Sequence, residues 1–316
     1  MTADPGPSAN EMVAASHLRR SRRRWRALFF IALVVAVLAV AGRFALERPG
    51  GLAGGGQIAR VEISGTIASD RDRDALFKKL GEDPNVKAVI VAINSPGGTT
   101  AGGEELYEEL GALRAKKPVA AVIDEMGASA AYMTALGADR IFARRLSMVG
   151  SIGVLFQSFN AGKLMDTIGI GTDKIASGPL KAEPDFSKPM SPEVRASLTS
   201  LVTDSFNWFV DIVAERRGLA RPDALTLADG RVVTGRQALA DRLIDAIGGQ
   251  PEAIAWLEAE KKITHGLPVV KRWPLPDTGL PDIGRLIGAE ARSVLGLPAE
   301  GPVALDGLVS LWQVGP

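Results

Sequence analysis

Ser129 lies at a point in the sequence where a serine could be presented as a nucleophile. The apolar run Val119–Ile123 predicts a buried strand, Gly127 predicts a turn, and the small residues after it predict the start of a helix. The spacing Gly127-x-Ser129-x-Ala131 is close to the G-x-S-x-G pattern that exposes a serine at the top of an α/β sheet. A serine at the start of a helix is more often an N-cap, so the motif alone leaves both interpretations open.

A nucleophilic serine needs a base, and the sequence offers little histidine for that role. The two histidines are His17, in a basic N-terminal stretch, and His265, in a late connecting segment, so neither is placed to serve Ser129. A lysine becomes the leading alternative, provided that burial lowers its pKa enough for it to accept a proton. Lys181 lies in a Gly/Pro turn beside apolar Leu180 and could be buried in this way. The residues alone leave four lysines as candidates: Lys163, Lys174, Lys181 and Lys188.

Two further segments could complete a site around Ser129. Asn94–Gly98, with the sequence NSPGG, directly follows the apolar run Ala88–Ile93, and two glycines at the end of a strand let backbone N–H groups approach a ligand closely. We expect an oxyanion donor there, complementing the N–H of Ala130. Ser151, in a small-residue loop, could orient a lysine amine. A plain turn and an ordinary loop serine are the alternatives for these two segments.

The composition excludes several classes of protein. The chain has 316 residues, a net charge of +1 and no cysteine. The near-neutral charge gives no case for nucleic-acid binding, and the lack of cysteine excludes disulfides, thiolate metal sites and cysteine nucleophiles. We expect neither a metal nor an organic cofactor. The length fits one large domain with appendages, or two small domains.

The N-terminal region predicts a membrane anchor. Residues 1–26 are polar and end in a cluster of six arginines, and the next sixteen residues carry no charge. Because positive charge stays on the cytoplasmic side, we expect a cytoplasmic tail, a single-pass anchor over residues 27–46 and an exported body. The alternative is a cleaved signal peptide, since Ala39-Val-Ala41 resembles a cleavage site. Residues 47–56 are rich in Gly and Pro and predict a linker.

The body of the chain alternates predicted strands and helices, which is typical of an α/β domain with parallel strands. The longest predicted helix, Pro192–Arg217, has Ser191 as its N-cap and Pro192 at its first position. We expect strands at Ile58–Ile67, Ala88–Ile93, Val119–Ile123, Ile141–Ala143 and Val149–Phe156, and helices at Asp70–Leu80, Thr100–Ala115, Asn160–Ile168, Pro192–Arg217, Val233–Ala246, Pro251–Lys262 and Asp282–Val294.

These motifs together resemble a known family, signal peptide peptidase A, which comprises Ser–Lys proteases of peptidase family S49. The resemblance covers about residues 56–260 and fits the short, single-domain form. It rests on the N-terminal anchor and on SPGG at Ser95–Gly98, GASAAY at Gly127–Tyr132, GSIGV at Gly150–Val154, SGPLK at Ser177–Lys181, DGRV from Asp229 and GRQAL from Gly235.

The resemblance implies the ClpP/crotonase-like α/β superfold, with repeated ββα units and parallel sheets flanked by helices. It also implies a role for each residue of the site. Ser129 would be the nucleophile, Lys181 the general base and Ser151 the residue that orients the lysine, and the oxyanion hole would be formed by Gly97, Gly98 and Ala130.

The resemblance further implies a place and a substrate. The protein would lie in the bacterial inner membrane, with its protease domain, residues 57–268, in the periplasm, and it would degrade cleaved signal peptides. It would form a homo-oligomeric ring, which we expect to be an octamer, with the serine and lysine of each site on neighbouring protomers. We expect the C-terminal extension, residues 269–316, to dock on a neighbouring subunit; contact with the membrane and covering of the substrate groove are the alternatives.

Other functions stay open at the level of sequence. A related membrane protease of the same fold, similar to SohB or to the stomatin-associated NfeD type, would cleave a membrane-protein partner instead. A non-catalytic ring scaffold and an acyl-CoA-handling crotonase share the superfold. The anchor and the Ser129–Lys181 arrangement favour a protease over both.

Overall fold

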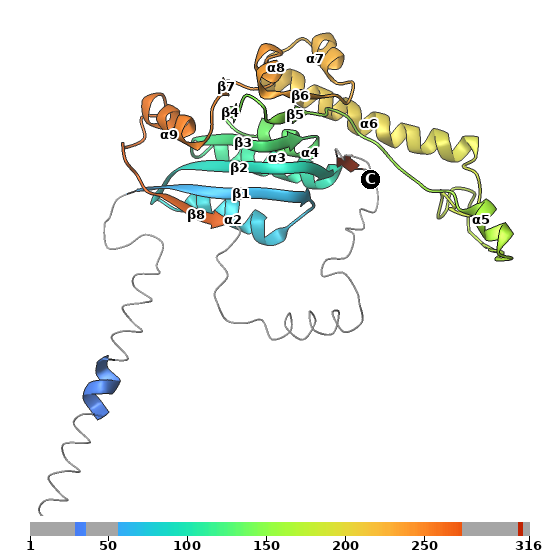
Figure 1. Cartoon of the computed structure of the whole chain (residues 1–316), viewed down its shortest axis with the longest axis horizontal. Helices are drawn as coiled ribbons and strands as arrows, with labels where there is room; N and C mark the ends of the chain where they lie inside the picture. The colour runs from blue at the N-terminus through green and yellow to red at the C-terminus, as the bar shows by residue number, and fades with distance from the viewer. Residues whose placement is uncertain (1–28, 36–55, 274–308, 312–316) are drawn as a thin grey trace, which may run out of the picture. The chain divides into compact units, whose positions relative to one another are not determined.

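The structure is a computed structural model that describes residues 29–35, 56–273 and 309–311 (Figure 1). The chain divides into two compact units, with the boundary after Gly55. The second unit contains alternating strands and helices around a mixed sheet, so the predicted α/β class is confirmed.

In the first unit, the described residues form one short helix, residues 29–35, whose apolar side chains are exposed. Across the three described stretches, no helix combines the length and the apolar character needed to cross a bilayer. The expected tail over residues 1–26, and most of the expected anchor and linker, lie outside the described residues.

Three long parallel strands form the centre of the sheet: β1 (Gln57–Ile67), β2 (Val86–Thr99) and β3 (Val119–Ala128). The central residues of β2 and β3 are apolar without interruption, as in parallel strands that are covered on both faces, whereas β1 also carries Arg60 and Glu62. Alternate residues point to opposite faces. Val61 therefore belongs to one core cluster and Ile58 to the other.

The long strands change partners along their length. The first half of β3 pairs with β4 (Arg140–Ala143), and its last residues pair with β5 (Met148–Gly150). The strands expected at Ile141–Ala143 and Val149–Phe156 are thus both present, although the second ends at Gly150. The remaining short strands are β6 (Val232–Thr234), antiparallel to β5; β7 (Ala246–Ile247), parallel to β4; β8 (Val269–Trp273), parallel to β1; and β9 (Val309–Leu311), antiparallel to the end of β2.

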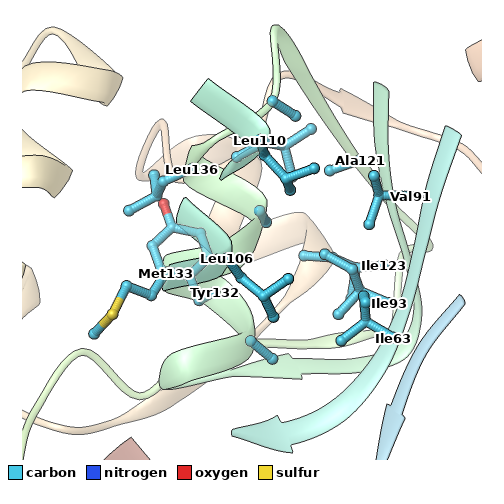
Figure 2. Close-up of a cluster of buried hydrophobic side chains, with 14 of the residues drawn as sticks. Ile63, Val91, Ile93, Leu106, Leu110, Ala121, Ile123, Tyr132, Met133 and Leu136 are labelled. Atoms are coloured by element: carbon cyan, nitrogen blue, oxygen red, sulfur yellow. The ribbon is translucent and has the colours of Figure 1, made fainter. Parts of the chain in front are cut away.

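Helices cover both faces of the sheet. Figure 2 shows the larger cluster, in which Leu106 and Tyr132 from two helices pack with Ile93 and Ile123 from the strands. Full burial of an aliphatic side chain contributes about 1.5–3 kcal/mol. On the other face, α9 places Trp256 against the sheet. The helices are α2 (Arg71–Glu82), α3 (Thr100–Arg114), α4 (Ala130–Leu136), α5 (Gly162–Thr167), α6 (Pro192–Arg217), α7 (Arg221–Leu227), α8 (Gly235–Ala240) and α9 (Gln250–Ala259).

The helix α6 begins and ends where the sequence predicts. The Ser191 side chain accepts a hydrogen bond from the Val194 N–H, and Gly218 ends the helix in the left-handed conformation. Its C-terminal half packs on the core, whereas its N-terminal half extends away from the sheet, towards α5 (Figure 1). We call residues 155–191, which include α5, the arm. The arm is closed on itself by a hydrogen bond of 2.7 Å from the Ala161 N–H to the Phe186 carbonyl.

Three elements differ from the sequence prediction. The segment Asn94–Gly98 continues β2 past the expected end of the strand at Ile93, because its last residues pair with β1 and β9. The predicted helix Val233–Ala246 is replaced by β6, the short helix α8 and β7. Residues 269–273 form β8 within the sheet, so the body extends past the expected boundary at 268. The predicted helix Asp282–Val294 lies outside the described residues.

Candidate active site

The backbone of Ser129 is strained at the junction of β3 and α4. Its φ is 58° and its ψ is −122°, a conformation that residues other than glycine rarely adopt. The residue is 1 % exposed, and its side chain makes no helix-capping hydrogen bond. The geometry therefore favours the nucleophile interpretation of this serine over the N-cap interpretation, since a capping serine has extended backbone angles and bonds to the helix.

Two backbone hydrogen bonds fix the junction of β3 and α4 at Ser129, which we call the elbow. The Ser129 N–H donates to the Gly150 carbonyl at 2.8 Å, and the Ser129 carbonyl accepts from the Met133 N–H at 2.9 Å. The helix behind it is fully buried, and the Tyr132 hydroxyl donates to the Leu243 carbonyl at 2.7 Å. The strained residue is thus held from both β5 and the core, which is what keeps such a conformation in place.

Gly97 and Gly98, at the end of β2, differ as possible donors of a backbone N–H to an oxyanion. The Gly97 N–H is already bonded to the Ser95 Oγ at 3.1 Å, and Gly97 has a φ of 110°. At Gly98, a Cβ atom would lie 1.9 Å from the Ile67 carbonyl oxygen, so only glycine fits. The geometry favours Gly98 over Gly97 as an oxyanion donor.

Ser151 is also held in a conformation unusual for serine. Its φ is 49°, it is 8 % exposed, and its N–H donates to the Arg231 carbonyl at 2.8 Å. It directly follows Gly150, whose carbonyl holds Ser129. The structure therefore brings Ser151 to the same edge of the sheet as the elbow.

The register of the strands brings the predicted segments together. Ser95 of β2 is paired with Gly127 of β3, and Gly127 is paired with Val149 of β5. The carboxyl ends of these strands, where α/β proteins commonly bind ligands, thus meet at one edge. The start of α3 packs closely on α4, since a Cβ atom on Gly103 would lie 2.9 Å from the Ala130 Cβ.

Lys181 does not share this edge within one chain. It lies in the arm, its side chain is exposed, and its N–H donates to the Gly178 carbonyl. Lys174, another candidate base, forms an ion pair with Glu183 in the arm.

Two positioning groups escaped the sequence analysis: the Ser95 hydroxyl and the Gly150 carbonyl. Ser95 lies inside the SPGG motif, but its hydroxyl is directed by the chain's path through the motif, which the sequence does not reveal. The Gly150 carbonyl is a backbone group and leaves no signal in side-chain patterns. The Ser95 hydroxyl accepts a hydrogen bond from the N–H of Gly97, and the Gly150 carbonyl accepts one from the N–H of Ser129, so both groups contact residues that the sequence analysis did place in the site.

A cluster of carboxylates lies away from the elbow, between α2 and α3. One oxygen from each of Asp74, Glu105 and Glu109 lies within 4.8 Å of the others. Burial first, and then a hydrogen bond and repulsion from Asp74, raise the pKa of Glu109 to about 9, and burial raises that of Glu105. Arg73 also lies beside the cluster, with its Nη2 3.9 Å from an oxygen of Glu105.

A serine held at a strained strand–helix elbow, beside backbone amides at the end of a parallel sheet, defines a serine hydrolase of the α/β class. Comparison of the sequence with protein families identifies one family within the serine hydrolases. The chain belongs to peptidase family S49, a family of serine peptidases, whose model matches residues 111–264.

Two relatives and one solved structure illustrate the similarity. The chain is 37 % identical over 202 residues to "Putative protease slr0021" of Synechocystis sp., covering 63 % of this chain and 73 % of that one. It is 30 % identical over 223 residues to "Putative signal peptide peptidase SppA" of Enterococcus faecium, covering 66 % and 64 %. The solved 1510-N membrane-bound stomatin-specific protease, in a mutant form, is 16 % identical with a TM-score of 0.46, covering 70 % of this chain and all of that one.

Proposed function

We propose that the protein is a membrane-anchored serine endopeptidase that degrades cleaved signal peptides with a Ser129–Lys181 dyad. The observation that carries this proposal is the elbow, where a non-glycine residue keeps a strained backbone and does not cap its helix. The signal-peptide substrate is supported by the name of the Enterococcus faecium relative. The changing partners of the long strands support the ClpP/crotonase-like superfold.

The reaction would be acyl transfer. The Ser129 Oγ attacks the peptide carbonyl while the neutral amine of Lys181 takes its proton, and the N–H groups of Gly98 and Ala130 stabilise the oxyanion. Lys181 then returns the proton to the leaving amine. Water, deprotonated by the same lysine, releases the acyl group from the serine. Ser151 would orient the lysine amine by a hydrogen bond.

The position of Lys181 supports a site shared between protomers. The lysine is an exposed residue of the arm, and the part of the arm around α5 extends away from the sheet. Large exposed apolar patches mark contact surfaces. The arm carries such side chains at Leu155, Phe159, Leu164, Ile168, Ile170, Ile175, Leu180 and Phe186. We infer that the arm of one protomer docks on the next, closing a ring, with an octamer as the working expectation.

The location is part of the same proposal. The six arginines before an uncharged stretch support an anchor with the N-terminus in the cytoplasm and the body in the periplasm of a bacterium. A site tethered beside the bilayer suits apolar peptides that leave it. The second candidate function is cleavage of a membrane-protein partner by the same dyad, and a difference in preferred substrate would separate the two.

The test uses detergent-purified full-length protein and a synthetic signal peptide. Ser129→Ala and Lys181→Ala should each lower kcat by about 10³-fold or more while still assembling. Lys188→Ala, which removes another exposed lysine of the arm, is the control and should stay active. If the wild type cleaves nothing, or if Lys181→Ala keeps most of its activity, the proposed dyad is wrong.

A mixing experiment tests the sharing. Equal amounts of Ser129→Ala and Lys181→Ala, dissociated and reassembled together, should recover about a quarter of the wild-type activity, because one site in four would combine an intact serine with an intact lysine from its neighbour. If each chain builds its own dyad, the mixture stays inactive.

A further inference from the structure

The helix α4, which directly follows Ser129, is too short to be stable by itself. It has 7 residues, whereas isolated helices shorter than about 12–15 residues are marginal in water. The strained backbone of Ser129 precedes it, and such a conformation persists only where the surrounding structure over-determines it. Groups that hold α4 in place therefore also hold Ser129.

Two adjacent arginines in the last turn of α6, Arg216 and Arg217, contact the surroundings of α4. Arg216 bonds to its C-terminal end, where the Nε donates to the Leu136 carbonyl and the Nη2 to the Ala138 carbonyl, both at 2.7 Å. The last carbonyls of a helix have no partner within the helix, and a positive charge beside them is favourable. Arg216 thus fixes the end of α4 that is remote from Ser129.

Arg217 acts on the same helix through a second segment. Its side chain is 10 % exposed, its two Nη atoms bond to the Asp245 carboxylate at 2.8 and 3.1 Å, and its Nε donates to the Arg242 carbonyl at 2.6 Å. Between these two partners in the sequence lies Leu243, whose carbonyl accepts the hydrogen bond of the Tyr132 hydroxyl. Arg217 therefore holds, from both sides, the carbonyl that anchors α4 at its first turn.

We propose that Arg216 and Arg217 are positioning residues for Ser129, because together they hold both ends of α4 and so keep the strained backbone of the serine in place. The catalytic meaning rests on the proposed function, whereas the effect on α4 does not. Without either arginine, α4 can shift and Ser129 can relax. A misplacement of about 1 Å can cost a reaction up to about 100-fold in rate. We therefore expect kcat to fall while KM stays the same.

The kinetic test uses single variants of the full-length, detergent-purified enzyme and a synthetic signal peptide. Arg216→Ala should lower kcat about tenfold at unchanged KM. Arg216→Lys, which keeps the charge and can bond one of the two carbonyls, should recover part of that loss. Arg217→Lys keeps a cation beside Asp245 and loses the fork of donors, so it should fold and also lower kcat.

Arg242→Ala is the matched control for these variants. The Arg242 guanidinium also bonds two carbonyls at the C-terminal end of a helix, but they are those of Arg217 and Gly218 at the end of α6. We expect Arg242→Ala to lower the midpoint of urea unfolding as Arg216→Ala does and to leave kcat unchanged. A fall in kcat as large as that of Arg216→Ala would reduce the effect to a general loss of stability and overturn the inference.

Hydrogen exchange followed by mass spectrometry tests the same arrangement without substrate. In Arg216→Ala, the amides of residues 129–137 should exchange about tenfold faster than in the wild type, and in Arg242→Ala they should exchange at the wild-type rate. Faster exchange in Arg216→Ala, together with a wild type that cleaves nothing, would uphold the role in holding α4 and refute the proposed protease. Unchanged exchange in Arg216→Ala would overturn the inference whether or not the wild type is active.

Discussion

At the scale of single residues, the site depends on backbone conformations that side chains normally avoid. Ser129 and Ser151 both have positive φ values, and the N–H of each donates a hydrogen bond to a carbonyl of a neighbouring strand or loop. Gly98 is required for a different reason, because the Ile67 carbonyl occupies the space of a side chain. Close approach of backbones therefore shapes this site as much as side-chain chemistry does.

A pair of glycine substitutions tests this point. Gly98→Ala should lower the free energy of unfolding by about 3 kcal/mol and abolish activity, because its Cβ would overlap the β1 backbone. Gly111→Ala, in the helix α3 with no atom within 4 Å of the added Cβ, should raise it by about 0.5–1 kcal/mol. Urea unfolding of both variants is the measurement. A tolerated Gly98→Ala would show that β2 can move away from β1.

At the scale of elements, much of the fold could be predicted from local pattern. The helix α6 was predicted to the residue, because its N-cap and first proline are local signals. The strand–helix elbow at Ser129 was predicted for the same reason. The strand β2 was expected to end at Ile93, and its continuation to Thr99 was missed, since the pairings of Gly97 and Gly98 with β1 and β9 are long-range. Ser151 was proposed from its small-residue loop as a residue that could orient a lysine amine, but local pattern could not show how close it lies to the elbow, because distances through space leave no local trace.

The contact between α2 and α3 should make stability depend on pH. The pKa of Glu109 is raised from its ordinary value of 4.5 to about 9, mainly by burial, with Asp74 adding to it and Arg73 opposing it. A raised pKa means that the folded state binds the proton more tightly than the unfolded state does. The contribution of protonated Glu109 to the free energy of unfolding is therefore complete below pH 4.5 and is lost as the pH rises through 9.

Glu109→Gln removes that dependence. Because the side chain is only half-buried, we expect a modest gain of about 1 kcal/mol in the free energy of unfolding at pH 9 and almost none at pH 4.5. Denaturant unfolding at the two pH values is the measurement. Glu108→Gln, on the exposed side of the same helix, is the control and should show no such difference. Equal effects of both substitutions would rule out the carboxylate cluster as the cause.

At the scale of the whole molecule, the arm carries large apolar side chains that the described part of the chain leaves exposed. Ile175 is 98 % exposed and Phe159 is 78 % exposed, although both are side chains that proteins normally cover. The proposed assembly would bury them and deliver Lys181 at the same time. Assembly and activity would then be gained or lost together.

Substitution of one arm residue tests this link. Ile175→Asp should shift the detergent-solubilised protein to smaller species in light-scattering chromatography and reduce turnover in parallel, because a charge in the docked arm would be desolvated. Leu225→Asp, on α7 away from the arm and 44 % exposed, is the control and should assemble normally. A fully assembled Ile175→Asp would place the subunit contact elsewhere.

The strained backbone of Ser129 also has an evolutionary consequence. At φ 58° and ψ −122°, glycine is the residue that relieves the strain, by about 1 kcal/mol or more. Drift in a lineage that no longer used this serine would therefore favour glycine at the position, with a gain in stability at each loss of the hydroxyl. Such a replacement in a descendant would record that selection for catalysis had ended there, even where the rest of the fold was kept.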